Sequence, residues 1–203
     1  MKMNLPNKLS LMRLFMVPVF VVVMLVSDAL WANLVGCALF GLAAITDLLD
    51  GIIARKYNLV TDFGKFMDPL ADKFMVIGAL LVILSKVMGD GNINSIFTTV
   101  YLTTVMLVIF RELAVTSIRL VVSSSSGVVV AANILGKVKT WLQSFCVLSC
   151  ILERAIYASI PNPHAYAEYL PFSLFLTVAM LVITLWSGIN YLASYWKYMD
   201  PEK

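Results

Sequence analysis

Charged residues are scarce in this sequence. Asp, Glu, Lys and Arg make up 13% of its 203 residues, whereas hydrophobic residues make up 61% and the mean hydropathy is +0.90. Soluble domains carry roughly 25% charged residues, because their surfaces must face water. So little charge excludes a water-soluble globular protein, since most of its apolar surface would have no polar cover. The composition predicts a protein whose solvent is lipid.

Cysteine and histidine are also rare. Cys37, Cys146 and Cys150 all lie in apolar stretches, and an odd number without framework spacing argues against structural disulfides. Cys146 and Cys150 share a helix face, but no histidine is near them, so we interpret them as packing residues. His164 is the single histidine and follows Asn162-Pro163, which is typical of a solvated loop. No Ser/His/Asp or Cys/His set stands out, so the sequence offers no clear nucleophile for covalent catalysis.

Long apolar windows are abundant. Each is long enough to cross a bilayer core as a helix of roughly 20 residues, and backbone groups in lipid must bond within their own segment, which favours helices. The windows are Leu11–Ser27, Leu30–Ala54, Pro69–Met88, Phe97–Val122, Val138–Ala158 and Pro171–Tyr195. We therefore expect an all-α polytopic membrane protein with six transmembrane helices, forming one domain over residues 1–203.

The basic residues are distributed unevenly between the two predicted faces. Six spans would place thirteen of the fifteen Lys and Arg residues on the side of both termini, and only Lys86 and Arg154 on the other. Such a bias predicts that both termini are cytoplasmic, and it explains the basic pI without a nucleic-acid partner. The opening residues show no transit-peptide pattern, which favours a bacterial plasma membrane.

Four aspartates flank the connection between the second and third windows: Asp47, Asp50, Asp68 and Asp72. The first two are three residues apart and the last two are four apart, so each pair projects from one helix face. Pro69 suits the first turn of the third span, with Asp68 as its cap. A short loop around Asn58–Gly64 would bring both pairs together at the cytoplasmic ends of antiparallel helices.

Close carboxylates repel one another, and burial in a medium of low dielectric constant increases the repulsion. Two divalent cations would offset the four charges, and oxygen ligands favour hard ions such as Mg²⁺, Mn²⁺ or Ca²⁺. Paired metals suit displacement at phosphorus. Gly51 and Ala54 leave the helix face bare for a nucleotide, and Arg55 would supply a fixed positive charge to a phosphate. The alternative is a set of solvated helix caps.

The complete pattern Asp47-x₂-Asp50-Gly51-x₂-Ala54-Arg55-x₈-Gly64-x₃-Asp68-x₃-Asp72 is similar at every named position to the signature of the CDP-alcohol phosphotransferases. The resemblance implies six membrane helices, a homodimer, and two Mg²⁺ or Mn²⁺ ions held by the four aspartates. It also implies an in-line attack on the lipid-bonded phosphate with CMP as leaving group, and Asp72 as general base. The residues expected to face the CDP-diacylglycerol nucleotide are Asp47, Asp50, Gly51, Ala54, Arg55 and Gly64.

Four basic residues form a second group: Arg111, Arg119, Lys137 and Lys139. Glu112 is the one acidic residue close to them in sequence, and we expect it to orient an arginine. A basic pocket suits an acceptor that carries its own phosphate, because arginine binds phosphate through two parallel hydrogen bonds. The alternative is ordinary positive-inside charge. It applies most to Lys139, since Lys137 and Lys139 cannot both point inward from a regular helix.

Three segments, Arg111–Arg119, Gly136–Gln143 and the opening Asn4-Leu-Pro-Asn7…Arg13…Pro18, resemble those of bacterial phosphatidylglycerophosphate synthases. The resemblance implies that the acceptor is sn-glycerol 3-phosphate. Ser123–Ser126 departs from the family, and we interpret it as a flexible connector.

Other functions stay open. The same chemistry could act on inositol phosphate, serine or phosphatidylglycerol, and an aspartate-rich prenyltransferase also uses Mg²⁺. A cation transporter would place carboxylates near the bilayer midplane and on the far side, whereas these aspartates cluster at one face.

Overall fold

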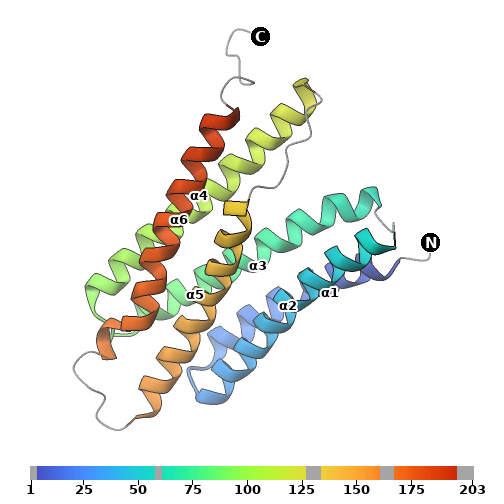
Figure 1. Cartoon of the computed structure of the whole chain (residues 1–203). Helices are drawn as coiled ribbons and strands as arrows, with labels where there is room; N and C mark the ends of the chain where they lie inside the picture. The colour runs from blue at the N-terminus through green and yellow to red at the C-terminus, as the bar shows by residue number, and fades with distance from the viewer. Residues whose placement is uncertain (1–3, 58–60, 127–133, 161–166, 196–203) are drawn as a thin grey trace.

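The computed structural model describes residues 4–57, 61–126, 134–160 and 167–195, and every regular element within them is helical (Figure 1). The helices are α1 (Leu5–Val26), α2 (Leu30–Lys56), α3 (Asp62–Gly89), α4 (Ser95–Ser126), α5 (Ile134–Ser159) and α6 (Pro171–Tyr195), with a short 3₁₀ turn, η1 (Ala167–Tyr169), before α6. Each apolar window of the sequence corresponds to one α-helix, so the prediction of an all-α chain is confirmed.

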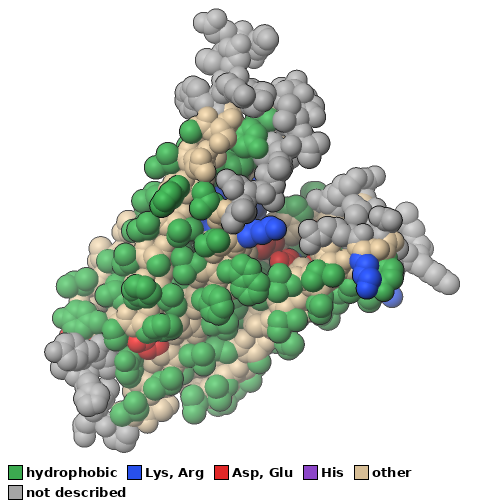
Figure 2. Space-filling view, viewed as in Figure 1, with side chains coloured by type: hydrophobic (Ala, Val, Ile, Leu, Met, Phe, Trp, Pro, Cys, Tyr) green, Lys and Arg blue, Asp and Glu red, His purple; other side chains and the backbone are tan. Residues whose placement is uncertain are grey.

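Four of the helices contain segments that are long and apolar enough to cross a membrane. They are Leu5–Val26, Leu30–Ala54, Ser95–Arg119 and Pro171–Tyr195. Helices α3 and α5 carry charged residues toward both ends, which shortens their uninterrupted apolar stretches. Hydrophobic side chains cover most of the face seen in Figure 2, while basic and acidic side chains gather in a hollow near its upper end.

The bundle consists of two packed groups of helices, which are joined by α5 and by the contact of α3 with α4. Helix α1 packs against α2 and α3, α6 packs against α4 and α5, and α5 also contacts α2 and α3. The buried core includes Phe20, Leu80, Cys146, Cys150 and Met180. Cys146 and Cys150 are free, buried thiols, as expected of packing residues. In Figure 1, α4 and α6 diverge from α1–α3 toward the end where α1 begins and α6 finishes.

Helix α3 begins earlier than the sequence predicted. Thr61 is its N-cap, and the Thr61 hydroxyl accepts a hydrogen bond from the Gly64 backbone N–H at 3.1 Å. Pro69 therefore lies inside the helix, and the prediction that Asp68 caps it is wrong. A threonine cap satisfies an N–H group that would otherwise be unpaired, whereas Pro69 only lacks an N–H of its own. Asp68 and Asp72 are thus carried on one continuous helical backbone.

Ser123–Ser126 also differs from the prediction. These serines form the last residues of α4 rather than a connector, because serine is only modestly unfavourable in a helix and the preceding turns are already formed. His164 and its neighbours Asn162-Pro163 lie outside the described residues.

At the other end of the bundle, Lys86 and Arg154 both bind the carboxylate of Asp28. Lys86 Nζ donates to Asp28 Oδ1 at 2.6 Å, and Arg154 Nη2 donates to the same oxygen at 3.0 Å. Arg154 Nε also donates to Asp90 Oδ2 at 3.2 Å. The hydrogen bond from the Lys86 ammonium, with Arg154 beside it, lowers the pKa of the Asp28 carboxyl below its usual value. These ion pairs join the α1–α2 turn to the ends of α3 and α5.

Candidate active site

Arg13 of α1 lies at the centre of the aspartate cluster. Its side chain is completely buried, and its two terminal nitrogens donate separately to Asp47 Oδ1 and Asp50 Oδ2 of α2. The two aspartates therefore share one helix face, as their spacing predicted. The sequence identified Arg13 as a basic residue and as part of the opening segment that carries the resemblance, but its place among the acids comes from the packing of α1 on α2.

Ser10 lies one turn before Arg13 on the same face of α1 and brings in the third aspartate. Its hydroxyl donates to Asp68 Oδ1 of α3 and lies 3.4 Å from Asp50 Oδ2. Carboxylates from two different helices thus meet at one hydroxyl. Asp72 is one turn further along α3 and lies within electrostatic reach of Asp47. Three aspartates surround two α1 side chains, and the fourth lies beside them.

The chemistry of these donors fits a hard divalent cation, since all of them are carboxylate or hydroxyl oxygens. Within the described part of the chain, no three acidic, histidine or cysteine side chains are arranged to bind one ion. The reason is visible in the contacts, because Asp47 and Asp50 are both turned toward Arg13. These oxygens could bind a metal ion in place of the arginine.

The small residues of the motif line the approach of neighbouring helices. A Cβ atom on Gly64 would lie 2.9 Å from Asn7 Oδ1 and 3.3 Å from Thr61 Oγ1. A side chain at position 64 would displace the Asn7 amide, whose oxygen accepts a hydrogen bond from the Thr61 hydroxyl at 3.0 Å. Gly51 and Ala54 are half-buried on α2, immediately after Asp50. The side chain of Arg55 lies outside the described part of the structure.

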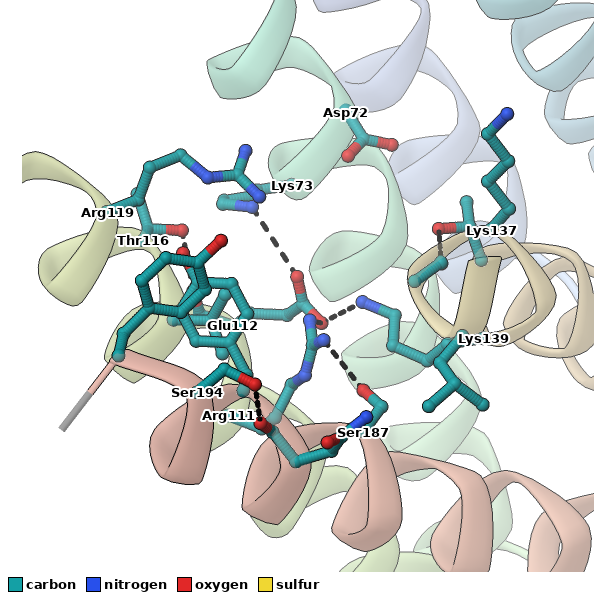
Figure 3. Close-up of a pocket in the computed structure, with 17 residues that line it drawn as sticks. Asp72, Lys73, Arg111, Glu112, Thr116, Arg119, Lys137, Lys139, Ser187 and Ser194 are labelled. Atoms are coloured by element: carbon teal, nitrogen blue, oxygen red, sulfur yellow. Dashed lines mark hydrogen bonds and ion pairs between the residues drawn. The ribbon is translucent and has the colours of Figure 1, made fainter. Parts of the chain in front are cut away.

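A cavity of about 580 Å³ opens beside Asp72 (Figure 3). Its walls come from four helices, α3 to α6. The polar residues that line it are Asp72, Lys73, Arg111, Glu112, Thr116, Arg119, Lys137, Lys139, Thr140, Ser187, Asn190, Tyr191, Ser194 and Tyr195. All four basic residues predicted to bind an acceptor phosphate are among them, on the same cavity as Asp72.

Glu112 is the acidic centre of the cavity wall. It accepts hydrogen bonds from Lys139, from Arg111 Nη1 at 3.2 Å and from Lys73 Nζ at 3.4 Å. The expectation that Glu112 orients an arginine is confirmed, and it binds two lysines as well. Lys139 is buried and Lys137 is exposed, yet both line the cavity. The prediction that the two cannot both point inward is confirmed, and the exposed Lys137 reaches the cavity from its rim.

Helix α6 supplies a polar wall that the sequence analysis missed. Arg111 Nη2 donates to Ser187 Oγ at 2.7 Å, and the adjacent Gly188 leaves room for the arginine stem. The buried hydroxyl of Tyr191 has no hydrogen-bond partner among the described residues. The signal was present in the sequence, since Ser187, Asn190, Tyr191 and Ser194 follow the i, i+3, i+4, i+7 spacing of one helix face in an otherwise apolar span.

The charges of the cavity favour an anionic ligand. Five basic and two acidic side chains line it, which leaves a net charge of +3. Three of the basic groups are engaged by Glu112, whereas Arg119 and Lys137 have no acidic partner within the residues that the structure describes. Figure 3 shows these two on opposite sides of the opening, with Asp72 between them. The arrangement can hold a phosphate with a proton acceptor nearby.

Comparison with known proteins gives consistent results. Residues 3–195 match the model of the CDP-alcohol phosphatidyltransferase family. A Bacillus subtilis protein named CDP-diacylglycerol–glycerol-3-phosphate 3-phosphatidyltransferase is 39% identical, over 98% of each chain. A protein of the same name from Salmonella paratyphi A is 35% identical over 96% of each chain. Another from Rickettsia felis is 40% identical over 73% of this chain and 75% of the relative. The chain belongs to the CDP-alcohol phosphatidyltransferase family.

Proposed function

We propose that this chain transfers the phosphatidyl group of CDP-diacylglycerol to sn-glycerol 3-phosphate, with release of CMP and formation of phosphatidylglycerophosphate. The observation that carries the proposal is the cavity in which Asp72 lies with Arg119 and Lys137. A carboxylate beside unpaired cations suits an acceptor that has both a hydroxyl and a phosphate. The names of the relatives agree with this substrate pair.

The aspartate cluster is the proposed site of the donor pyrophosphate. Asp47, Asp50, Asp68 and Asp72 would hold two Mg²⁺ or Mn²⁺ ions, which would neutralise the pyrophosphate and stabilise charge on the leaving CMP. Gly51, Ala54, Arg55 and Gly64 belong to the same motif and complete the proposed nucleotide site. Ser10 supports this site from α1, because its hydroxyl fixes the Asp68 carboxylate.

Asp72 is the proposed general base. It lies on the cavity, whereas the other three aspartates do not line it. An acceptor hydroxyl next to Asp72 would lose its proton to the carboxylate as its oxygen bonds to the phosphorus that carries diacylglycerol. The bond from that phosphorus to the CMP oxygen breaks, and CMP leaves. General-base assistance of this kind contributes roughly 10²–10⁴-fold to a rate.

The basic residues divide into two roles. Arg119 and Lys137 would contact the acceptor phosphate directly, since no acid in the described structure neutralises them. Arg111 and Lys139 are held by Glu112 and Ser187, so they would present fixed hydrogen-bond donors and positive charge. A dianionic phosphate needs both, because it approaches a region that already holds four aspartates and a pyrophosphate.

The membrane arrangement follows from the same proposal. All six helices would span the bilayer, with both termini and the active site on the cytoplasmic side, and two chains would form a homodimer in a bacterial plasma membrane. The charged ends of α3 would place its aspartates at the interface and leave its apolar centre in lipid. Lys86 and Arg154, which share Asp28 at the far end, would lie outside.

The test is release of CMP by the purified protein. CDP-diacylglycerol is supplied with glycerol 3-phosphate, inositol phosphate, serine or phosphatidylglycerol, and lipid products are identified by mass spectrometry. We expect rapid CMP release with glycerol 3-phosphate but not with the other three acceptors, and phosphatidylglycerophosphate as the lipid product. Equal rates with serine would disprove the acceptor assignment but keep the aspartate chemistry. No CMP with any acceptor would disprove the enzyme and favour a cation transporter.

A further inference from the structure

Arg13 is unusual among the charged residues because it is fully buried inside an apolar helix. Its side chain is 0% exposed, and α1 is the most apolar of the four membrane-spanning segments. A charge buried away from water is costly unless it is paired. Arg13 is paired twice, by one nitrogen to Asp47 and by the other to Asp50. Its partners are the carboxylates that form the first half of the family motif.

We propose that Arg13 is a built-in counterion that holds the aspartate cluster together without metal and competes with divalent cations for Asp47 and Asp50. The inference rests on the proposed metal site and concerns what sets its affinity. Arg13 is thereby a positioning residue, since it acts through the two carboxylates.

The physical basis is the charge of the cluster. Asp47 and Asp68 each lie within electrostatic reach of Asp50, and like charges repel strongly where the dielectric constant is low. The guanidinium offsets one of these charges, and Ser10 ties Asp68 to the same place. A cation that binds Asp47 and Asp50 must take oxygens that Arg13 now holds. Arg13 therefore stabilises the metal-free protein and weakens metal binding.

Methionine at position 13 tests both effects, because it keeps much of the side-chain length but removes the charge. Thermal unfolding of the chelator-treated protein in detergent is followed by tryptophan fluorescence, with and without Mn²⁺. Without metal, Arg13→Met is expected to lower the Tm by roughly 10 °C, because the carboxylates lose their counterion. Saturating Mn²⁺ should restore most of this difference. The Mn²⁺ concentration for half-saturation, measured by electron paramagnetic resonance, should fall on the order of tenfold, as expected for loss of one competing unit charge.

Arg154→Met is the matched control. Arg154 is a half-buried arginine that is likewise shared by two aspartates, but it lies at the opposite end of the bundle. Its substitution should lower the Tm equally with and without Mn²⁺ and leave half-saturation unchanged. A structural role for Arg13 would give this same behaviour.

Two results would overturn the inference. One is a Mn²⁺ half-saturation for Arg13→Met that is equal to or higher than that of the wild type. If Arg13→Met does not fold, Arg13→Lys replaces it, because lysine keeps the charge but cannot hold both carboxylates through a planar fork. The Mn²⁺ concentration for half-saturation of Arg13→Lys should then be lower than that of the wild type, by a smaller factor. If it is not lower, the inference is overturned. The other result is a wild-type protein that binds no Mn²⁺, which removes the metal site itself but leaves the CMP-release test of the acceptor unaffected.

Discussion

Lys139 of α5 and Glu112 of α4 form an ion pair in the cavity wall, with side chains only 5% and 8% exposed. The two residues are 27 positions apart in sequence and join two helices. Glu112 also pairs with Arg111 and with Lys73 of α3. One carboxylate thus fixes three cations from three helices. Glu112 thereby balances part of the positive charge of the cavity wall.

Glu112→Gln should destabilise the protein more than a surface substitution would. The change leaves Lys139 buried without a counter-charge, and breaking such a pair costs about 3–5 kcal/mol. Thermal unfolding in detergent measures the loss. The double variant Glu112→Gln/Lys139→Met should lose less than the sum of the two single variants, since neither charge is then left alone. Additive losses would show that the pair does not stabilise the fold.

Arg119→Ala should raise the KM for glycerol 3-phosphate by roughly tenfold or more, because it removes one hydrogen-bonded charge from the acceptor phosphate. The KM for CDP-diacylglycerol should change little. Arg119→Lys should give an intermediate value, since it keeps the charge but loses the planar fork. Lys137→Met should act in the same direction.

The matched control for Arg119 is Arg154→Ala, which removes an arginine far from the cavity and should alter neither KM. Steady-state rates of CMP release, with each substrate varied in turn, provide both constants. An unchanged acceptor KM in Arg119→Ala would mean that the phosphate binds elsewhere.

Activity should depend on a divalent metal. A chelator should abolish CMP release, and Mg²⁺ or Mn²⁺ should restore it, because the aspartates cannot hold a pyrophosphate without cations. Alanine at Asp47, Asp50 or Asp68 should each lower kcat/KM by roughly 10²-fold or more, equivalent to about 2.7 kcal/mol of barrier. Glu153→Ala, a carboxylate at the other end of the bundle, is the control. Full activity in metal-free protein would contradict the proposed metal site.

Much of the fold could be predicted, because lipid imposes a simple pattern on a sequence. Hydropathy alone located all six helices, and the window Pro171–Tyr195 matches α6 residue for residue. The start of α3 differs from the prediction, because Pro69 indicated the first turn of the helix whereas Thr61 is its N-cap. Both residues favour a helix start, and a single sequence does not decide between them.

The site was predictable only in part, for a different reason. Residues within one helix reveal their shared face through spacing, so Asp47 with Asp50, and Asp68 with Asp72, could be found. Arg13 is 34 and 37 residues from its two partners, and no local pattern encodes that contact. The polar face of α6 could have been found from its spacing, but its contact with Arg111 required the packing of α4 on α6.

The proposed topology can be tested with reporters. A fusion after Lys203 should report a cytoplasmic location, and an insertion at Asn92, in the turn between α3 and α4, should report an external one. Six spans place these positions on opposite sides. The same location for both would mean that one of the three helices between them, α4 to α6, does not cross the membrane, and α5, the least apolar of the three, should be examined first.

Asp28 should make stability depend on pH at the end of the bundle opposite the cavity. The Lys86 hydrogen bond lowers the pKa of its carboxyl below 3.8, so folding favours the ionised form. The stabilisation is therefore fully present above the pKa of the unfolded chain, near 3.8, and is lost as the pH falls through the lower folded-state pKa.

Because Asp28 is largely exposed, the effect is modest, and Asp28→Asn should lower the Tm at pH 7 by only about 2–4 °C. That difference should persist down to about pH 4 and narrow below it, since the wild type then loses the same charge. Tm values of both proteins between pH 3 and pH 7 measure it, and a gap that stays constant below pH 4 would mean that the carboxylate charge of Asp28 is not what binds Lys86 and Arg154.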